Sequence, residues 1–286
     1  MLIVLFDGIA YGMLLFLISV GLSVTLGLMR FVNLAHGAFA MIGGYVLFVA
    51  TARLGLSFWT GLLASFVITG VVAGLLEWLL FRRLYARGAL DQVLLSIGLI
   101  FMLVAGASFV FGPTLKTIVV PAFLDGQLRV GDSEVGRYRL FMIAVGLVLT
   151  LVLGWVITRT RYGAQVRAAV DRQQTANALG IRVNRLFALT FSVGSGLAGL
   201  GGALGVNILG LDPAFPLKYL VYFLLVVCVG GAGTITGPLV AAILIGLADV
   251  AGKYYLPSMG SFVVYLVMVL MLIVRPHGLI PQKGAA

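Results

Sequence analysis

The sequence predicts an all-α integral membrane protein, a polytopic bundle of transmembrane helices. Two observations support this prediction: 62% of the 286 residues are hydrophobic, and only 10% are charged. Soluble domains carry about 25% charged residues. Helices this apolar could not cover one another's hydrophobic faces in water. A bilayer accepts them because each helix pairs its own backbone polar groups. Residues 1–286 are therefore expected to form one transmembrane domain.

Nine apolar segments are candidates for membrane spans, because about 20 mostly apolar residues cross the hydrocarbon core. They are 8–28, 34–52, 57–81, 93–111, 140–158, 186–209, 217–232, 238–252 and 258–274. Segments 217–232 and 238–252 are short and flank a glycine-rich break. They predict either two crossings, which we favour, or a re-entrant pair buried in protein. The bundle is thus expected to have about eight or nine spans, or seven if the pair is re-entrant.

The arginines and lysines predict the orientation, since they collect in cytoplasmic loops. Loop 159–185 holds six arginines against one acid, Asp171, so it is expected to be cytoplasmic. Counting crossings places the amino terminus outside, the carboxyl terminus inside, and the mixed-charge loop 112–139 outside. Other basic residues then also fall inside: Arg30, Arg82, Arg83, Arg87, Arg275, His277 and Lys283. The net charge of +10 is explained in this way and does not indicate nucleic-acid binding.

The sequence lacks the residues that several classes of membrane protein need. Ionisable groups are scarce inside the predicted spans, and Glu77, Asp249 and Lys253 fall near span ends. Ion-coupled carriers and proton pumps usually keep such groups within the membrane. The sequence contains none of the motifs HExxH, GxSxG, CxxC or Walker A, and no cluster that suggests a metal site. We therefore expect a protein that is not an enzyme and binds no cofactor or metal. Any uphill transport would need outside energy.

Loop 159–185 contains a candidate helix with its own termination signals. Asp171 is followed three residues later by Gln174, a capping-box pattern, and Gly180 stands where a helix C-cap would fall. These signals predict a helix of about two turns over 172–179. It could act as a rigid lever for a soluble partner. From these residues alone, an ordinary basic loop with an incidental helix is the favoured interpretation, and the lever is the alternative.

Glycines form a second group of candidate residues. Pairs spaced four apart let helix backbones approach closely: Gly8/Gly12, Gly70/Gly74, Gly201/Gly205 and Gly233/Gly237. Most such glycines are expected simply to pack the bundle. The dense run 194–203 and the break 230–238 suggest segments that bend or slide. The candidate flexible positions are Gly196, Gly199, Gly230, Gly231, Gly233 and Gly237.

Two polar residues open the second predicted span. Asn33 and His36 could line a polar path through the membrane. They could equally cap the helix at the interface, because asparagine is a favoured N-cap residue. The capping interpretation is preferred here, and the path interpretation stays open.

Taken together and in order, five blocks of the sequence resemble one family: the permease subunits of bacterial branched-chain amino acid ABC importers, the LivH type. The blocks are 21–27 with 32–37, 41–45, 161–169 with 178–181, 230–238, and 275–279. The similarity covers nearly the whole chain. It implies an ABC-importer permease fold, a location in the bacterial inner membrane, and branched-chain or related amino acids as substrate.

The resemblance also implies partners and a role for loop 159–185. Two ATPase subunits hold the ATP and perform the hydrolysis. A second permease subunit, more naturally a homologous chain than a second copy, completes the membrane part, and an extracytoplasmic binding protein delivers substrate. The implied ATPase-coupling residues are Asp171, Arg172, Gln174, Ala178, Leu179, Gly180 and Ile181. Urea or short-chain amides remain alternative substrates. An energy-independent channel or facilitator remains an alternative class.

Overall fold

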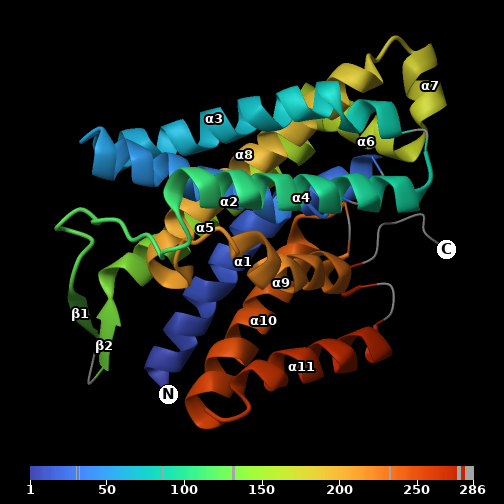
Figure 1. The fold of residues 1–286 in the computed structure, drawn as a ribbon. Helices are drawn as coiled ribbons and strands as arrows, with labels where there is room; N and C mark the ends of the chain where they lie inside the picture. Colours follow the sequence, from blue (N-terminus) through green and yellow to red (C-terminus); the bar gives the residue numbers. More distant parts are fainter. Residues whose placement is uncertain are drawn as a thin grey trace.

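The computed structural model describes residues 1–29, 31, 33–85, 87–130, 133–231, 233–275 and 278–280, which form a helical bundle (Figure 1). Its elements are α1 (Leu2–Met29), α2 (His36–Phe48) continued by a π-helical turn (Val49–Arg53), α3 (Phe58–Leu79), a 3-10 turn (Phe81–Leu84), α4 (Ala89–Phe111), β1 (Gln127–Val130), β2 (Ser133–Gly136), α5 (Arg137–Arg159), α6 (Arg161–Asp171), α7 (Gln173–Ala178), α8 (Val183–Leu209), α9 (Phe215–Gly230), α10 (Thr236–Tyr255) and α11 (Gly260–Val274).

The predicted class is confirmed: each of the nine apolar segments coincides with a helix. Among the described residues, six helices are long and apolar enough to cross a membrane, namely α1, α3, α4, α5, α8 and α10. Helices α9 and α11 are apolar but shorter. The antiparallel hairpin β1–β2, which the sequence did not predict, lies in the loop between α4 and α5.

The core of the bundle is built on α1 and α8, which are mostly buried, whereas α4 and α5 are mostly exposed. Close backbone approaches hold the core together, as the spaced glycines predicted. Gly8 and Gly12 face Gly246 of α10, where an added Cβ would lie 2.5 Å from the Gly8 oxygen and the Gly12 nitrogen. Gly201 packs on the α1 backbone, where an added Cβ would lie 3.0 Å from the Ile18 nitrogen, and Gly205 faces the Leu14 side chain at 3.2 Å. Small residues therefore determine how closely these helices pack.

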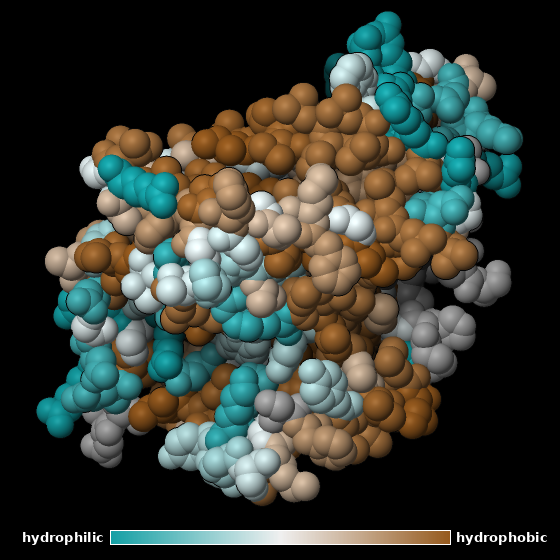
Figure 2. All heavy atoms as spheres, in the orientation of Figure 1, coloured by the Kyte–Doolittle hydropathy of each residue, from teal (hydrophilic) through white to brown (hydrophobic). Residues whose placement is uncertain are grey.

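The polar parts of the chain lie at two ends of the bundle (Figure 1). One end carries α6 and α7. The other carries the β-hairpin and the start of α1, where Asp7 forms an ion pair with Arg139 of α5. Figure 2 shows a broad hydrophobic surface between a hydrophilic region over α6 and α7 and another around the β-hairpin. This separation is what helices crossing an apolar slab require.

The glycine-rich break between α9 and α10 is a tight turn fixed to α1. The Gly233 amide donates to the Ser23 oxygen at 2.8 Å, and the Ser23 hydroxyl donates to the Thr234 oxygen at 3.0 Å. From this turn, α10 runs for 20 residues, about 30 Å at 1.5 Å per residue. Helix α9 has only 16 residues. The choice between a crossing and a re-entrant segment for α9 therefore stays a prediction.

Candidate functional site

The predicted coupling loop is a pair of helices rather than one short helix. Thr160 caps α6, because its hydroxyl oxygen accepts from the Gly163 amide at 3.1 Å. Asp171 consequently ends α6, and the N-cap of α7 is Arg172, which makes no side-chain capping bond. The capping-box prediction was therefore wrong. The stretch before Asp171 is a helix of its own rather than the predicted loop, with Gly163, Val166 and Ala169 on its buried face.

The predicted C-terminal glycine is confirmed. Gly180 has a φ of +83°, the left-handed conformation that glycine adopts without strain. Its amide donates to the Asn177 oxygen at 3.0 Å, and the Ile181 amide donates to the Ala176 oxygen at 3.0 Å. This pair of bonds is a Schellman motif. It closes α7 and turns the chain back toward α8.

A small second cluster of apolar side chains ties α6 and α7 to the base of α8. Its buried members are Val166, Ala169, Ala176, Val183, Leu186 and Phe187. The Tyr162 hydroxyl lies 2.7 Å from the Thr190 hydroxyl, which itself donates to the Leu186 oxygen. Tyr162 is thus the donor of that contact, and burial raises the pKa of its hydroxyl, which keeps the proton in place. The two short helices and α8 therefore form one packed unit.

The remaining predicted coupling residues lie on the outer side of this unit. Asp171, Arg172, Gln174, Ala178 and Gly180 are exposed, whereas Ile181 is half-buried against the cluster. Leu179 is 76% exposed, a large apolar side chain at the end of an otherwise polar element. A cavity of about 460 Å³ lies beside it, lined in part by Tyr162, Arg182 and Arg185. The predicted coupling residues are thus mostly exposed, and their coupling role stays a prediction.

Asn33 and His36 lie inside the bundle, 1% and 2% exposed. The preferred capping interpretation was wrong: the N-cap of α2 is Ala35, and no side chain caps this helix. The His36 Nε2 instead lies 2.8 Å from the Ile18 oxygen of α1. His36 Nδ1 and both side-chain atoms of Asn33 have no hydrogen-bond partner. Buried polar atoms without partners are costly, about 1–3 kcal/mol each, and need an explanation.

Sequence reasoning missed four further buried hydroxyls with no partner: Ser19, Tyr45, Thr69 and Ser195. Tyr45 lies on α2 itself, and the other three come from α1, α3 and α8. A hydroxyl in an apolar helix gives no recognisable pattern in one sequence, so only their burial identifies them. With Asn33 and His36 they make the bundle interior more polar than its hydropathy suggests.

The six candidate flexible glycines occupy tight contacts or turns. A Cβ added to Gly196 would lie 2.8 Å from the Phe66 oxygen, and one added to Gly199 would lie 2.5 Å from the Thr69 hydroxyl. Gly230 and Gly237 touch each other across the break, where an added Cβ at Gly237 would lie 1.9 Å from the Gly230 oxygen. Gly231 and Gly233 have positive φ angles of 94° and 81°. Close packing and turn geometry explain these glycines, and their bending stays a prediction.

Some predicted residues lie outside the described part of the chain. They are Arg30, Val32, Ala232, Pro276, His277 and Lys283. Within the described ranges, no three His, Cys, Asp or Glu side chains come together as a metal site would require.

The fold defines a polytopic helical membrane protein, and α6 and α7 form a structured polar element at one end of it. The comparison with known families gives its place among such proteins. The chain belongs to the family of branched-chain amino acid transport system permease components, whose model matches residues 4–272. It is therefore a transport permease subunit of an ABC system.

Individual relatives agree with this assignment. The chain is 28% identical to the high-affinity branched-chain amino acid transport system permease LivH of Escherichia coli K12, over 96% of this chain and 94% of that one. It is 26% identical to BraD of Pseudomonas aeruginosa, over 96% and 94%. It is 28% identical to a probable LivH of Methanocaldococcus jannaschii, over 96% and 91%. No solved structure matches.

Proposed function

We propose that the chain is the membrane-spanning subunit of an ATP-driven importer that moves branched-chain or related amino acids into the cytoplasm. The observation that supports this proposal most is the unit formed by α6, α7 and the base of α8. A capped helix with an exposed Leu179 at its end suits docking on a separate protein. The named relatives transport branched-chain amino acids.

The proposed mechanism is alternating access. ATP, held by two partner ATPase subunits, supplies the energy. Their movement displaces α7, and the apolar cluster passes the displacement to α8. Because α8 packs against α1, α2 and α3, its movement rearranges the centre of the bundle. The buried hydroxyls, Asn33 and His36 then become the polar lining of the open path. Substrate or water in that path would supply hydrogen-bond partners for the polar atoms that have none in this structure.

The proposed assembly follows from the same roles. A second permease subunit, preferably a homologous chain, would face this one across the membrane. An extracytoplasmic binding protein would deliver substrate at the end that carries the β-hairpin. Under this proposal the amino terminus is outside, and α6 and α7 are in the cytoplasm.

Substitution of Gly180 tests the coupling role. Gly180→Val forces a branched residue to φ +83° and is expected to open the turn after α7. We expect substrate-stimulated ATP hydrolysis and uptake by the assembled complex to fall about tenfold or more, and Asp171→Ala to weaken both. The matched control is Gly55→Val, which places the same strain, φ +63°, in the exposed loop at the opposite end. If both variants, Gly180→Val and Asp171→Ala, retained full coupled hydrolysis and uptake, the α7 region could not be the docking site.

Cysteine labelling tests the proposed orientation. With Cys228, the single cysteine, changed to serine, Leu115→Cys and Ala164→Cys place a thiol on exposed positions at the two ends. A membrane-impermeant maleimide is expected to label Leu115→Cys on intact cells. Ala164→Cys should react only after the membrane is opened. The reverse pattern would contradict the proposed topology.

A self-sufficient channel is the competing function. A channel would need no docking helix, and the purified chain alone in liposomes would then equilibrate amino acids at full rate. The proposed importer subunit is expected to show no uptake until its partners and ATP are added.

A further inference from the structure

A cavity of about 440 Å³ lies at the end opposite α7, where α1, α5, α8, α9 and α10 converge. Its volume falls within the roughly 300–1,000 Å³ of small-molecule sites. Figure 2 shows hydrophilic residues around a recess on this part of the molecule. The residues that matter for recognition are Asp7, Tyr11, Arg139, Tyr222, Asp249 and Lys253.

Two ion pairs place opposite charges in this one cavity. Asp7 of α1 pairs with Arg139 of α5, which is 132 residues away in the sequence. Within α10, Lys253 Nζ lies 2.6 Å from Asp249 Oδ2, an ion pair with the i,i+4 spacing that favours a helix. The Asp249 side chain is only 3% exposed, whereas Lys253 is 52% exposed. The carboxylate is therefore fixed inside the cavity, and the cation can move away from it.

Tyrosines complete the polar wall. The Tyr222 hydroxyl donates to Asp249 Oδ1 at 3.0 Å, which holds the carboxylate from a second side. The Tyr11 and Tyr222 rings meet edge to face, with centroids 6.4 Å apart. Lys253 Nζ lies 5.8 Å from the centroid of the Tyr11 ring. A cation beside Asp249 thus lies against an aromatic face, where cation–π attraction adds to the ion pair.

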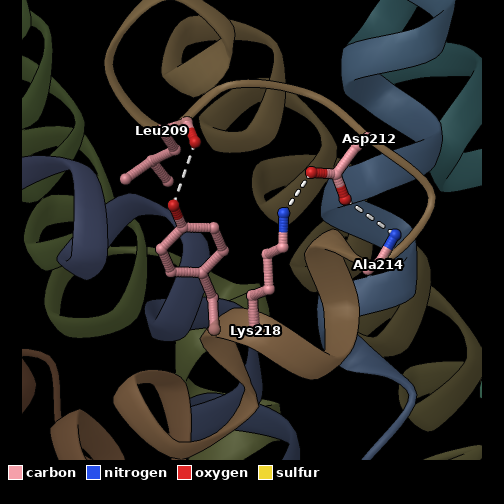
Figure 3. A network of polar contacts seen from close by, with 5 residues as sticks. Leu209, Asp212, Ala214 and Lys218 are labelled. Atoms are coloured by element: carbon pink, nitrogen blue, oxygen red, sulfur yellow. Dashed lines mark hydrogen bonds and ion pairs between the residues drawn. The ribbon is translucent and has the colours of Figure 1, made fainter. Parts of the chain in front are cut away.

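One wall of the cavity lies beside the turn between α8 and α9 (Figure 3). The Tyr219 hydroxyl donates to the Leu209 oxygen at 2.9 Å, and both residues line the cavity. In the same turn, Asp212 pairs with Lys218 and accepts from the Ala214 amide at 2.8 Å. Asp212 and Lys218 are not part of the lining, so this ion pair serves as a natural control.

The charges of the lining sum to zero, with two acids against two bases, and this balance selects the class of ligand. A simple anion or cation would meet its own charge as often as the opposite one. A zwitterion would place its ammonium between the fixed Asp249 carboxylate and the Tyr11 ring. Its carboxylate would meet the guanidinium of Arg139 or the ammonium of Lys253. An apolar side chain would contact the tyrosine rings and Ile208.

The geometry points to this cavity as the site where a small zwitterionic amino acid first contacts the permease. The inference rests on the proposed function, because it assigns the cavity to the side from which substrate arrives. In the empty site the four charged side chains pair with one another. When the ligand binds, its ammonium and carboxylate would replace one partner in each of these ion pairs.

Protection from labelling tests the inference in the assembled complex. In a Cys228→Ser background, Ile208→Cys places a thiol on the cavity wall, and the exposed Leu115→Cys is the control. L-leucine is expected to slow maleimide labelling of Ile208→Cys several-fold and to leave Leu115→Cys unchanged. Isocaproate, which is leucine without the ammonium, and isoamylamine, which is leucine without the carboxylate, should not protect. Equal protection by all three compounds, or none by leucine, would overturn the inference.

Charge removal gives a second readout. Asp249→Asn keeps the shape of the carboxylate and is expected to raise the leucine concentration for half-protection about tenfold. Asp212→Asn removes an ion pair of the same kind outside the cavity and should not change it. ATP-driven leucine uptake by the wild-type complex is measured in parallel. Uptake without protection rejects this site alone, whereas absence of amino-acid uptake rejects the proposed function.

Discussion

Replacing Gly43 with alanine is expected to disrupt the centre of the bundle. An ideal Cβ at this position would lie 2.1 Å from the Gly199 oxygen and 2.3 Å from the Gly199 Cα. Both contacts are with backbone, so no rotamer change can relieve them, and α2 and α8 would have to separate. The Gly43 oxygen also accepts from the Ser65 hydroxyl at 2.9 Å, a bond to α3 that the separation would break. We expect the free energy of unfolding to fall by about 3 kcal/mol, at the upper end of the usual cost of overpacking a core.

The matched control is Gly98→Ala in the exposed helix α4, where an added Cβ meets no atom within 4 Å. Alanine stabilises a helix interior relative to glycine by about 0.5–1 kcal/mol, so this variant should be as stable as the wild type or slightly more stable. Thermal unfolding of the purified full chains in detergent compares the two. A Gly43→Ala midpoint equal to that of Gly98→Ala would show that the helices can separate without cost.

The pairs of glycines show what a sequence can and cannot predict. Spacing alone indicated that Gly8 and Gly12 would pack closely on another helix, and the contact with α10 confirms it. Gly43 was not in any such pair, yet its contact with Gly199 is among the tightest. Glycines spaced four apart within one helix predict that one face of that helix carries only small side chains. Which helix it meets depends on the packing of the whole bundle.

The polar residues also include some whose role the local sequence predicts and some whose role depends on distant parts of the chain. Gly180 was predictable as a helix C-cap because a Schellman motif is local. The pairing of Asp7 with Arg139 spans 132 positions and leaves no local signal. The capping box at Asp171 failed for a related reason, since two adjacent helices compete for the same residue and the packing of Val166 and Ala169 decides in favour of α6.

Replacing Ala176 with aspartate is expected to disconnect the docking helix from the membrane helices. Ala176 is 1% exposed and belongs to the apolar cluster that also contains Val183 and Phe187 of α8. A carboxylate cannot be buried there without a partner, so α7 would swing away from the cluster and expose the new charge to water. The Schellman bond to the Ala176 oxygen is formed by backbone, so α7 itself can persist. We expect uptake by the assembled complex to fall about tenfold or more, with the ATPase subunits still bound.

The control for this variant is Ala164→Asp, which adds the same charge to an exposed position of α6. It should leave uptake within about twofold of wild type, as is usual for surface substitutions. Uptake and retention of the ATPase subunits on the purified permease are measured together, because the two readouts separate the transmission of movement from docking. If Ala176→Asp retained normal uptake, displacement of α7 could not pass through this cluster. The link to α8 would then have to run through Tyr162 and Thr190, the one side-chain hydrogen bond that joins α6 to α8 among the described residues.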